Sequence, residues 1–187
     1  MRKIYLTNNP LQTKKLGEKL AKEILKARPG KEALILGLEG DLGGGKTTFL
    51  QGFAKGLGVK QKILSPTFII MRKFKIGNHG PSTDGLGLGP ALLQKGGAGG
   101  CKLKIENFFH IDCYRIKKPK ELLDLGFKEI ISSPKNIVVI EWAEKIKKLL
   151  PQNTIWLKFE FIEEKTRKIA IKNFRGRVSR LFIFMLK

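Results

Sequence analysis

The residues best suited to chemistry in this 187-residue chain lie in one glycine-rich segment, GDLGGGKT, which runs from Gly40 to Thr47. The segment matches G-x-x-x-x-G-K-[ST], the phosphate-binding loop, at every fixed position. Glycines allow consecutive backbone N–H groups to point inward at a phosphate. In such loops the lysine, here Lys46, reaches the β and γ phosphates, and the following hydroxyl, here that of Thr47, ligates Mg²⁺. The sequence therefore predicts a site for nucleotide phosphates and Mg²⁺.

Two carboxylates that follow apolar stretches are candidates to complete this site. Glu141 comes directly after the β-branched run 137–140. A buried parallel strand there would deliver its carboxylate to the sheet edge where ligands bind, as a second Mg²⁺ ligand. Asp112 lies in the segment HIDCYR, and we expect it to orient an attacking water, directly or through the metal's water shell. In an extended segment His110, Asp112 and Tyr114 would share one face.

Three further side chains have weaker signals. Thr67 lies in SPTF, where a switch-like loop would place its hydroxyl near the γ-phosphate, although the segment also reads as a simple turn with a proline. Trp142 either caps the core or presses on the nucleotide site. A pairing of Cys113 with His110, as a thiol nucleophile or zinc pair, is disfavoured because no further Cys/His pair supports it.

Hydrophobic periodicity predicts the elements that must position these residues. An edge strand is expected over 2–6, followed by a helix with Asn9 as N-cap and Pro10 as its first residue, ending before Gly30. A buried strand over 33–38 leads into the glycine-rich loop, and a helix over 47–57 follows it. The remaining elements are strands over 67–76, 104–111, 136–140, 155–162 and 168–174, the last two as a hairpin, and helices over 120–125 and 142–150.

This alternation predicts an α/β fold: a P-loop NTPase-like three-layer sandwich with a mostly parallel central sheet and a C-terminal antiparallel hairpin. The length suits a single domain over residues 1–187. Residues 77–100, dominated by glycine, are expected to form a flexible surface insertion, with a functional lid as the alternative. Residues 175–187 form a basic and then apolar tail whose pattern does not decide its structure.

Composition bounds the function. Lys and Arg number 37 against 16 Asp and Glu, so the formal net charge is +21. Such a charge suits a polyanionic partner, but the lysines are spread along the whole chain, as a lysine-rich genome would also produce. No uncharged apolar run approaches the roughly 20 residues of a membrane span, and the N-terminus lacks a signal-peptide core. We therefore expect a cytoplasmic protein that does not cross a membrane.

Five motifs together resemble one known family. GDLGGGKTTF, SPTF, FHIDCYRI, ELLDLGF and VVIEWAEKI occur in this order. They are similar to the TsaE family, the bacterial P-loop ATPases of tRNA N6-threonylcarbamoyladenosine biosynthesis, over about residues 1–76 and 104–168. The resemblance implies ATP and Mg²⁺ as cofactors. It also implies a TsaB–TsaD type protein complex as partner, with tRNA reached only indirectly through that complex.

The resemblance also assigns roles to residues. Thr47 and Glu141 would hold Mg²⁺, Asp112 would serve hydrolysis, Thr67 and Trp142 would be functional neighbours, and Arg167 is the candidate for an arginine near the nucleotide. The loop residues expected to hold the phosphates are Gly43, Gly44, Gly45, Lys46, Thr47 and Thr48. The insertion and the basic apolar tail depart from the family's usual pattern.

Two other functional classes stay open on the sequence. A P-loop small-molecule kinase would need an acceptor pocket and usually an arginine-rich lid, and residues 77–100 contain no arginine. A basic RNA-binding protein with a nucleotide site would use the positive charge, but no RNA-domain motif accompanies it. No N-K-x-D motif for reading guanine occurs. Because no arginine finger is identifiable, we expect the hydrolysis reaction to be slow until a partner completes the site.

Overall fold

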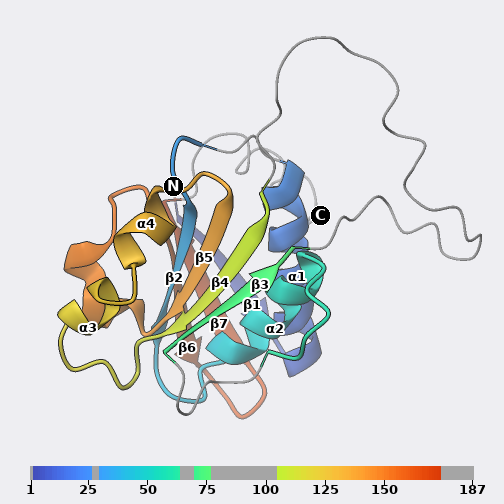
Figure 1. The fold of residues 1–187 in the computed structure, drawn as a ribbon. Helices are drawn as coiled ribbons and strands as arrows, with labels where there is room; N and C mark the ends of the chain where they lie inside the picture. The colour runs from blue at the N-terminus through green and yellow to red at the C-terminus, as the bar shows by residue number, and fades with distance from the viewer. Residues whose placement is uncertain (1, 27–29, 64–69, 77–104, 174–187) are drawn as a thin grey trace, which may run out of the picture.

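The fold is built on one mixed β-sheet (Figure 1). The structure, a computed structural model, describes residues 2–26, 30–63, 70–76 and 105–173. Within these ranges seven strands form the sheet in the order β1-β7-β6-β2-β5-β4-β3. Their bounds are β1 Arg2–Thr7, β2 Leu34–Gly40, β3 Met71–Lys75, β4 Asn107–Asp112, β5 Asn136–Glu141, β6 Ile155–Phe161 and β7 Arg167–Lys172. The central strands β6, β2, β5 and β4 are parallel, and β1, β7 and β3 pair antiparallel at the two edges.

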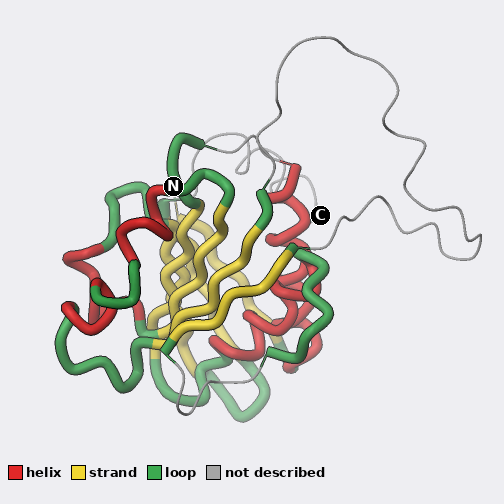
Figure 2. Tube along the Cα trace, in the orientation of Figure 1, coloured by secondary structure: helices red, strands yellow, loops and turns green. Residues whose placement is uncertain are grey.

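Helices cover both faces of the sheet, which gives the three layers predicted from the sequence (Figures 1 and 2). Helices α1 (Pro10–Lys26) and α2 (Lys46–Gly56) lie on one face. The short helices α3 (Lys120–Leu123) and α4 (Phe127–Ser132) and the 3-10 helix η2 (Ala143–Leu149) lie on the other. Each face buries its own hydrophobic cluster against the sheet. None of the helices in the described part of the chain is long and apolar enough to cross a membrane.

Strand alternation decides which polar residues face α2. On β4, Phe108 belongs to the cluster under α1 and α2, whereas Phe109 and Ile111 belong to the opposite cluster. Because side chains alternate along a strand, His110 and Asp112 lie on the α2 side with Phe108. The same alternation on the fully buried β5 places Glu141 on that side too. Three polar residues therefore lie on the α2 side of the sheet.

The two long helices contact each other backbone to backbone. Helix α1 begins as predicted, because the Asn9 side-chain oxygen accepts a hydrogen bond from the Gln12 amide at 2.9 Å. A Cβ built on Gly17 would lie 2.2 Å from the Phe49 carbonyl oxygen, and one on Gly52 would lie 1.9 Å from that of Lys14. Only glycine permits this approach, so these two residues fix α2 against α1.

Several predicted elements differ from those observed. The predicted helix 120–125 ends at Leu123, and a second helix, α4, which the sequence reading missed, starts after Gly126 in the left-handed conformation (φ 74°). The predicted helix 142–150 is the 3-10 helix η2, because Trp142 adopts positive φ and Ile146 has non-helical angles. The N-terminal strand and the C-terminal hairpin are confirmed. The expectations for Thr67, for residues 77–100 and for residues 175–187 lie outside the described residues.

Candidate nucleotide-binding site

The glycine-rich loop joins β2 to α2 in the arrangement predicted for a phosphate-binding loop. Gly40 has φ 123° and Gly45 has φ 97°, conformations that residues with a side chain rarely adopt. Gly40 also lies against β6, where an added Cβ would be 2.1 Å from the Phe159 carbonyl oxygen. The loop's shape therefore depends on these glycines, and it ends at the N-terminus of α2, where the helix dipole favours an anion.

Lys46 folds back over its own loop. Its ammonium donates hydrogen bonds to the carbonyl oxygens of Gly40 at 2.6 Å and Asp41 at 2.8 Å, and it lies 3.9 Å from the centre of the Trp142 ring. Burial lowers the pKa of Lys46, while the charge of Glu141 opposes that shift. Among the described residues, the acceptors of the ammonium are these two neutral carbonyl oxygens, and an anionic phosphate oxygen would offer a bond roughly twice as strong.

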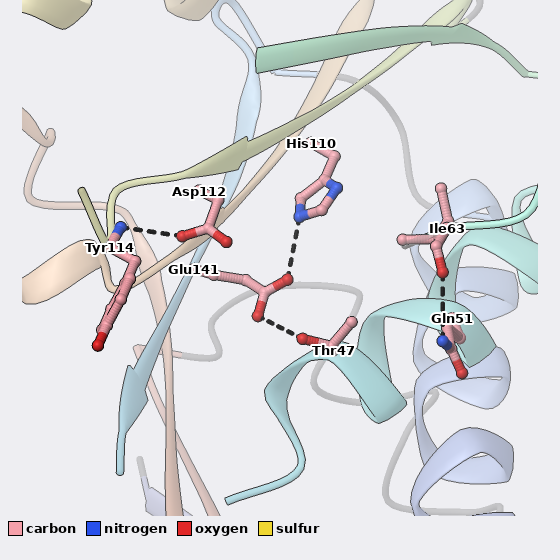
Figure 3. A network of polar contacts seen from close by, with 7 residues as sticks. All are labelled: Thr47, Gln51, Ile63, His110, Asp112, Tyr114 and Glu141. Atoms are coloured by element: carbon pink, nitrogen blue, oxygen red, sulfur yellow. Dashed lines mark hydrogen bonds and ion pairs between the residues drawn. The ribbon is translucent and has the colours of Figure 1, made fainter. Parts of the chain in front are cut away.

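Glu141 is the centre of the polar network on the α2 side of the sheet (Figure 3). Its Oε2 accepts a hydrogen bond from the Thr47 hydroxyl at 2.8 Å, and its Oε1 lies 3.0 Å from Nε2 of His110. The Glu141 side chain is only 2% exposed. Proteins that bind Mg²⁺ together with substrate phosphates supply a few oxygen ligands of their own, and a hydroxyl beside a carboxylate is such a set. The predicted pair, Thr47 and Glu141, is therefore brought together and fits Mg²⁺.

Asp112 lies beside this pair on the neighbouring strand. It is directly opposite Glu141 in the β4–β5 register, and its Oδ1 accepts a hydrogen bond from the Tyr114 amide at 2.9 Å. Strand β4 ends at Asp112, so Tyr114 lies in the turn beyond the strand, where its ring packs 5.0 Å from that of Trp142. The strand register thus places Asp112 next to the candidate metal ligands.

The disfavoured pairing of Cys113 with His110 does not form. Cys113 is buried in the cluster on the opposite face of the sheet, and His110 contacts Glu141 instead. Burial raises the pKa of the Cys113 thiol to about 12, and the charge of Asp112 adds to the effect. A thiol so hard to ionise is a poor nucleophile and a poor metal ligand.

Arg167 lies against the loop from the C-terminal hairpin. Its Nε donates to the Gly43 carbonyl oxygen at 3.2 Å, and its guanidinium lies 4.5 Å from the centre of the Phe161 ring. Its Nη1 donates to carbonyl oxygens of the turn between β6 and β7. Arg167, the candidate for an arginine near the nucleotide, is therefore in contact with the phosphate-binding loop.

A pocket opens between the loop, α1 and the hairpin turn. Its lining comprises Pro10, Thr13, Gly43, Gly45, Thr48, Glu164, Lys165 and Arg167. Sequence reasoning missed Thr13, although a signal existed. Thr13 is a polar residue on the buried, largely apolar face of α1, and its hydroxyl is hydrogen-bonded to that of Thr7 at 2.8 Å.

Trp142 and Glu144 complete the surroundings of Lys46. Trp142 contacts the Lys46 ammonium and also packs against the hydrophobic cluster on the opposite face of the sheet, so its position is compatible with both roles that the sequence left open. Its φ of 58° turns the chain directly after Glu141. Glu144, which the sequence reading missed, has an exposed side chain, and the pKa of its carboxyl group is raised by partial desolvation, an effect that the charge of Lys46 opposes.

Comparisons with known proteins agree with this arrangement. The family model described as threonylcarbamoyl adenosine biosynthesis protein TsaE matches residues 7–83 and 100–169. The tRNA threonylcarbamoyladenosine biosynthesis protein TsaE of Rickettsia felis is 32% identical over 169 residues, which cover 90% of this chain and 78% of that protein. Its namesake in Bacillus subtilis is 31% identical over 166 residues, covering 89% and 82%.

A solved structure extends the similarity to the fold. The crystal structure of Bacillus subtilis YdiB matches with a TM-score of 0.63 at 27% identity, covering 98% of this chain and 93% of that chain. The segments matched by the family model contain the phosphate-binding loop, Asp112, Glu141 and Arg167.

Proposed function

Because this chain belongs to the TsaE family and acts in tRNA threonylcarbamoyladenosine biosynthesis, we propose that it does so as a Mg²⁺-dependent ATPase. The observation that supports this most directly is the contact of Thr47 with Glu141. It joins a loop hydroxyl to a strand-end carboxylate 94 residues away, beside a phosphate-binding loop. Metal-assisted phosphoryl chemistry requires this juxtaposition, whereas a merely structural glycine-rich turn does not.

In the proposed reaction the chain's main task is to bind and position ATP. The backbone amides of residues 43–48 and the N-terminus of α2 would hold the phosphates, and Lys46 would exchange its carbonyl partners for β and γ phosphate oxygens. Thr47 and Glu141 would hold Mg²⁺, which supplies neutralisation of charge on the phosphates when bound. We propose that the nucleoside part of ATP, which the phosphate-binding loop does not hold, lies toward the pocket lined by Thr13 and Arg167.

Hydrolysis also needs a group that orients water. Asp112 is our candidate, because the strand register sets it next to Glu141. Its carboxylate would accept a hydrogen bond from the attacking water and turn an oxygen lone pair toward the γ-phosphate. Thr67 stays part of the proposal, as a hydroxyl near the γ-phosphate. The described residues that contact the loop include one arginine, Arg167, and its donors are directed at backbone carbonyl oxygens.

We further propose that the protein works in the cytoplasm with a TsaB–TsaD type complex and reaches tRNA through it. Its positive charge would then add a long-range attraction to tRNA that salt screens. Isolated protein should hydrolyse ATP slowly, because apart from the bound Mg²⁺, Lys46 and the loop amides, none of the described residues is directed at the transferred phosphoryl group to stabilise its charge. Stimulation by the complex is the expected behaviour.

The test is ATP hydrolysis by Glu141→Gln across a Mg²⁺ titration, with and without TsaB–TsaD. Glutamine keeps the size and can keep both hydrogen bonds, so the fold should survive while the metal loses its charged ligand. The matched control is Glu32→Gln, the same change at an exposed carboxylate. Glu32 lies just before the start of β2, whereas the phosphate-binding loop lies at the end of that strand.

The expected result is loss of Mg²⁺-stimulated hydrolysis in Glu141→Gln alone. Unchanged Mg²⁺ dependence in that variant would contradict the proposal. Transfer of the γ-phosphate to an added nucleoside, in place of release as inorganic phosphate, would instead identify a small-molecule kinase.

A further inference from the structure

One buried residue of the polar network has no place in the proposed reaction. His110 lies in the middle of β4 and is 1% exposed. Phe108, two residues earlier on the same face of the strand, is fully buried. Its Nε2 lies 3.0 Å from Oε1 of Glu141, and its Nδ1 is buried with no hydrogen-bond partner among the described residues. Figure 3 shows the ring above the carboxylate, on the side away from Thr47.

Core packing does not account for a histidine here. Burying an imidazole removes two polar nitrogen atoms from water, and only one of them regains a partner. A side chain such as that of Phe108 would fill a buried position on this strand without that loss. An N–H group on Nδ1 would have no acceptor among the described residues, whereas an N–H group on Nε2 can donate to Glu141. The arrangement that satisfies every N–H group therefore has the proton on Nε2 and none on Nδ1. The compensating contact is therefore the one to Glu141.

We infer that His110 is a positioning residue of the Mg²⁺ site, acting through Glu141. Its Nε2–H group holds Oε1 of the carboxylate, which fixes the rotation of the carboxylate plane and leaves Oε2 directed at the Thr47 hydroxyl. The inference rests on the proposed function, because it concerns how the metal ligands are held. Partners of this kind matter, since their removal typically lowers metal affinity by about 10–100-fold.

A competing cation makes the orientation of Glu141 consequential. Lys46 interacts electrostatically with Glu141, and both side chains are buried on the same side of the sheet. A carboxylate free to rotate could pair with that ammonium and turn Oε2 away from Thr47. By occupying Oε1, His110 keeps the carboxylate available to the metal and the ammonium available to phosphate.

Two amide substitutions separate positioning from packing. The side-chain nitrogen of glutamine is as many bonds from Cα as Nε2 of histidine, whereas that of asparagine matches Nδ1. His110→Gln can therefore still donate to Glu141, and His110→Asn cannot reach it. Both variants bury the same amide group, so each is the other's control for polarity.

The readout is binding of Mn²⁺, an oxygen-preferring substitute for Mg²⁺, to the full-length protein saturated with ADP, measured by electron paramagnetic resonance. We expect His110→Asn to weaken Mn²⁺ binding by about 10–100-fold and His110→Gln to stay within a few-fold of the wild type. Affinity for ADP without metal should be the same in all three proteins. Equal Mn²⁺ affinity in the wild type and His110→Asn would overturn the inference alone. Absence of Mn²⁺ binding in the wild-type ADP complex would refute the proposed metal-dependent ATPase and the inference with it.

A measurement that leaves His110 unchanged tests the donor assignment. The chain has only two histidines, His79 and His110, so imidazole ¹⁵N signals can be assigned with one substitution at His79. We expect a proton on Nε2 of His110 that exchanges slowly with solvent. A proton on Nδ1 with a bare Nε2 would refute the proposed contact, because a bare nitrogen cannot donate to a carboxylate.

Discussion

Replacing Gly52 by alanine should separate the two helices that carry the nucleotide site. The new Cβ would lie 1.9 Å from the Lys14 carbonyl oxygen and 2.6 Å from its carbonyl carbon. Ordinary contact needs roughly 1.5 Å more, and backbone atoms cannot rotate away as a side chain could. The clash must therefore be relieved by moving α1 relative to α2.

The expected loss of stability follows from two opposing effects. Alanine is intrinsically better than glycine inside a helix by about 1 kcal/mol. Overpacking a filled interface typically costs about 1–3 kcal/mol, and a clash between two backbones belongs at the upper end. We therefore expect the free energy of unfolding of Gly52→Ala to fall by about 2 kcal/mol. Affinity for ATP should fall as well, because Thr13 on α1 and Thr48 on α2 line the same pocket.

Urea denaturation followed by circular dichroism measures the free energy of unfolding, and fluorescent-nucleotide titration measures binding. The control is Gly30→Ala, where the nearest atom to an added Cβ is 3.8 Å away. That variant should unfold within about 0.5 kcal/mol of the wild type. If Gly52→Ala were as stable as the wild type, the close backbone contact between α1 and α2 would be refuted.

Three further predictions concern single side chains of the site and its surroundings. Lys46→Ala should abolish productive ATP binding while the fold persists, because it removes the charge facing the β and γ phosphates; calorimetric titration checks this, and an unchanged affinity would contradict the phosphate-loop assignment. Asp112→Asn should bind ATP normally but lose about 10²–10⁴-fold in turnover, a value typical of a general base; full single-turnover hydrolysis would remove Asp112 from the mechanism. Burial raises the pKa of Cys113 to about 12, so its thiol should resist iodoacetamide at pH 9. At that pH an ordinary thiol, with a pKa near 9, is half ionised and reacts. Rapid alkylation of Cys113 in the folded protein would contradict its burial.

The sequence by itself determined the features that are encoded locally. The phosphate-binding loop is one, because its conformation depends on glycines within eight consecutive residues and its chemistry on the adjacent Lys46 and Thr47. The start of α1 is another, since Asn9 and Pro10 specify it through a local hydrogen bond. The apolar run before Glu141 likewise predicted a buried strand that ends in a carboxylate. The motifs also predicted the family, which the comparisons confirm.

The tertiary structure alone decided which of these features meet. The contact of Thr47 with Glu141 requires β2 and β5 to be neighbours, and that of Arg167 with Gly43 brings together residues 124 positions apart. His110 was set beside Asp112 by its place in the strand, but its bond to Glu141 depends on the register of β4 against β5. Periodicity reports which face of a strand is buried and says nothing of which strand lies next to it. Strand order and register are fixed by packing between distant segments. For that reason the sequence could name the residues of the proposed metal site but could not predict which of them come into contact.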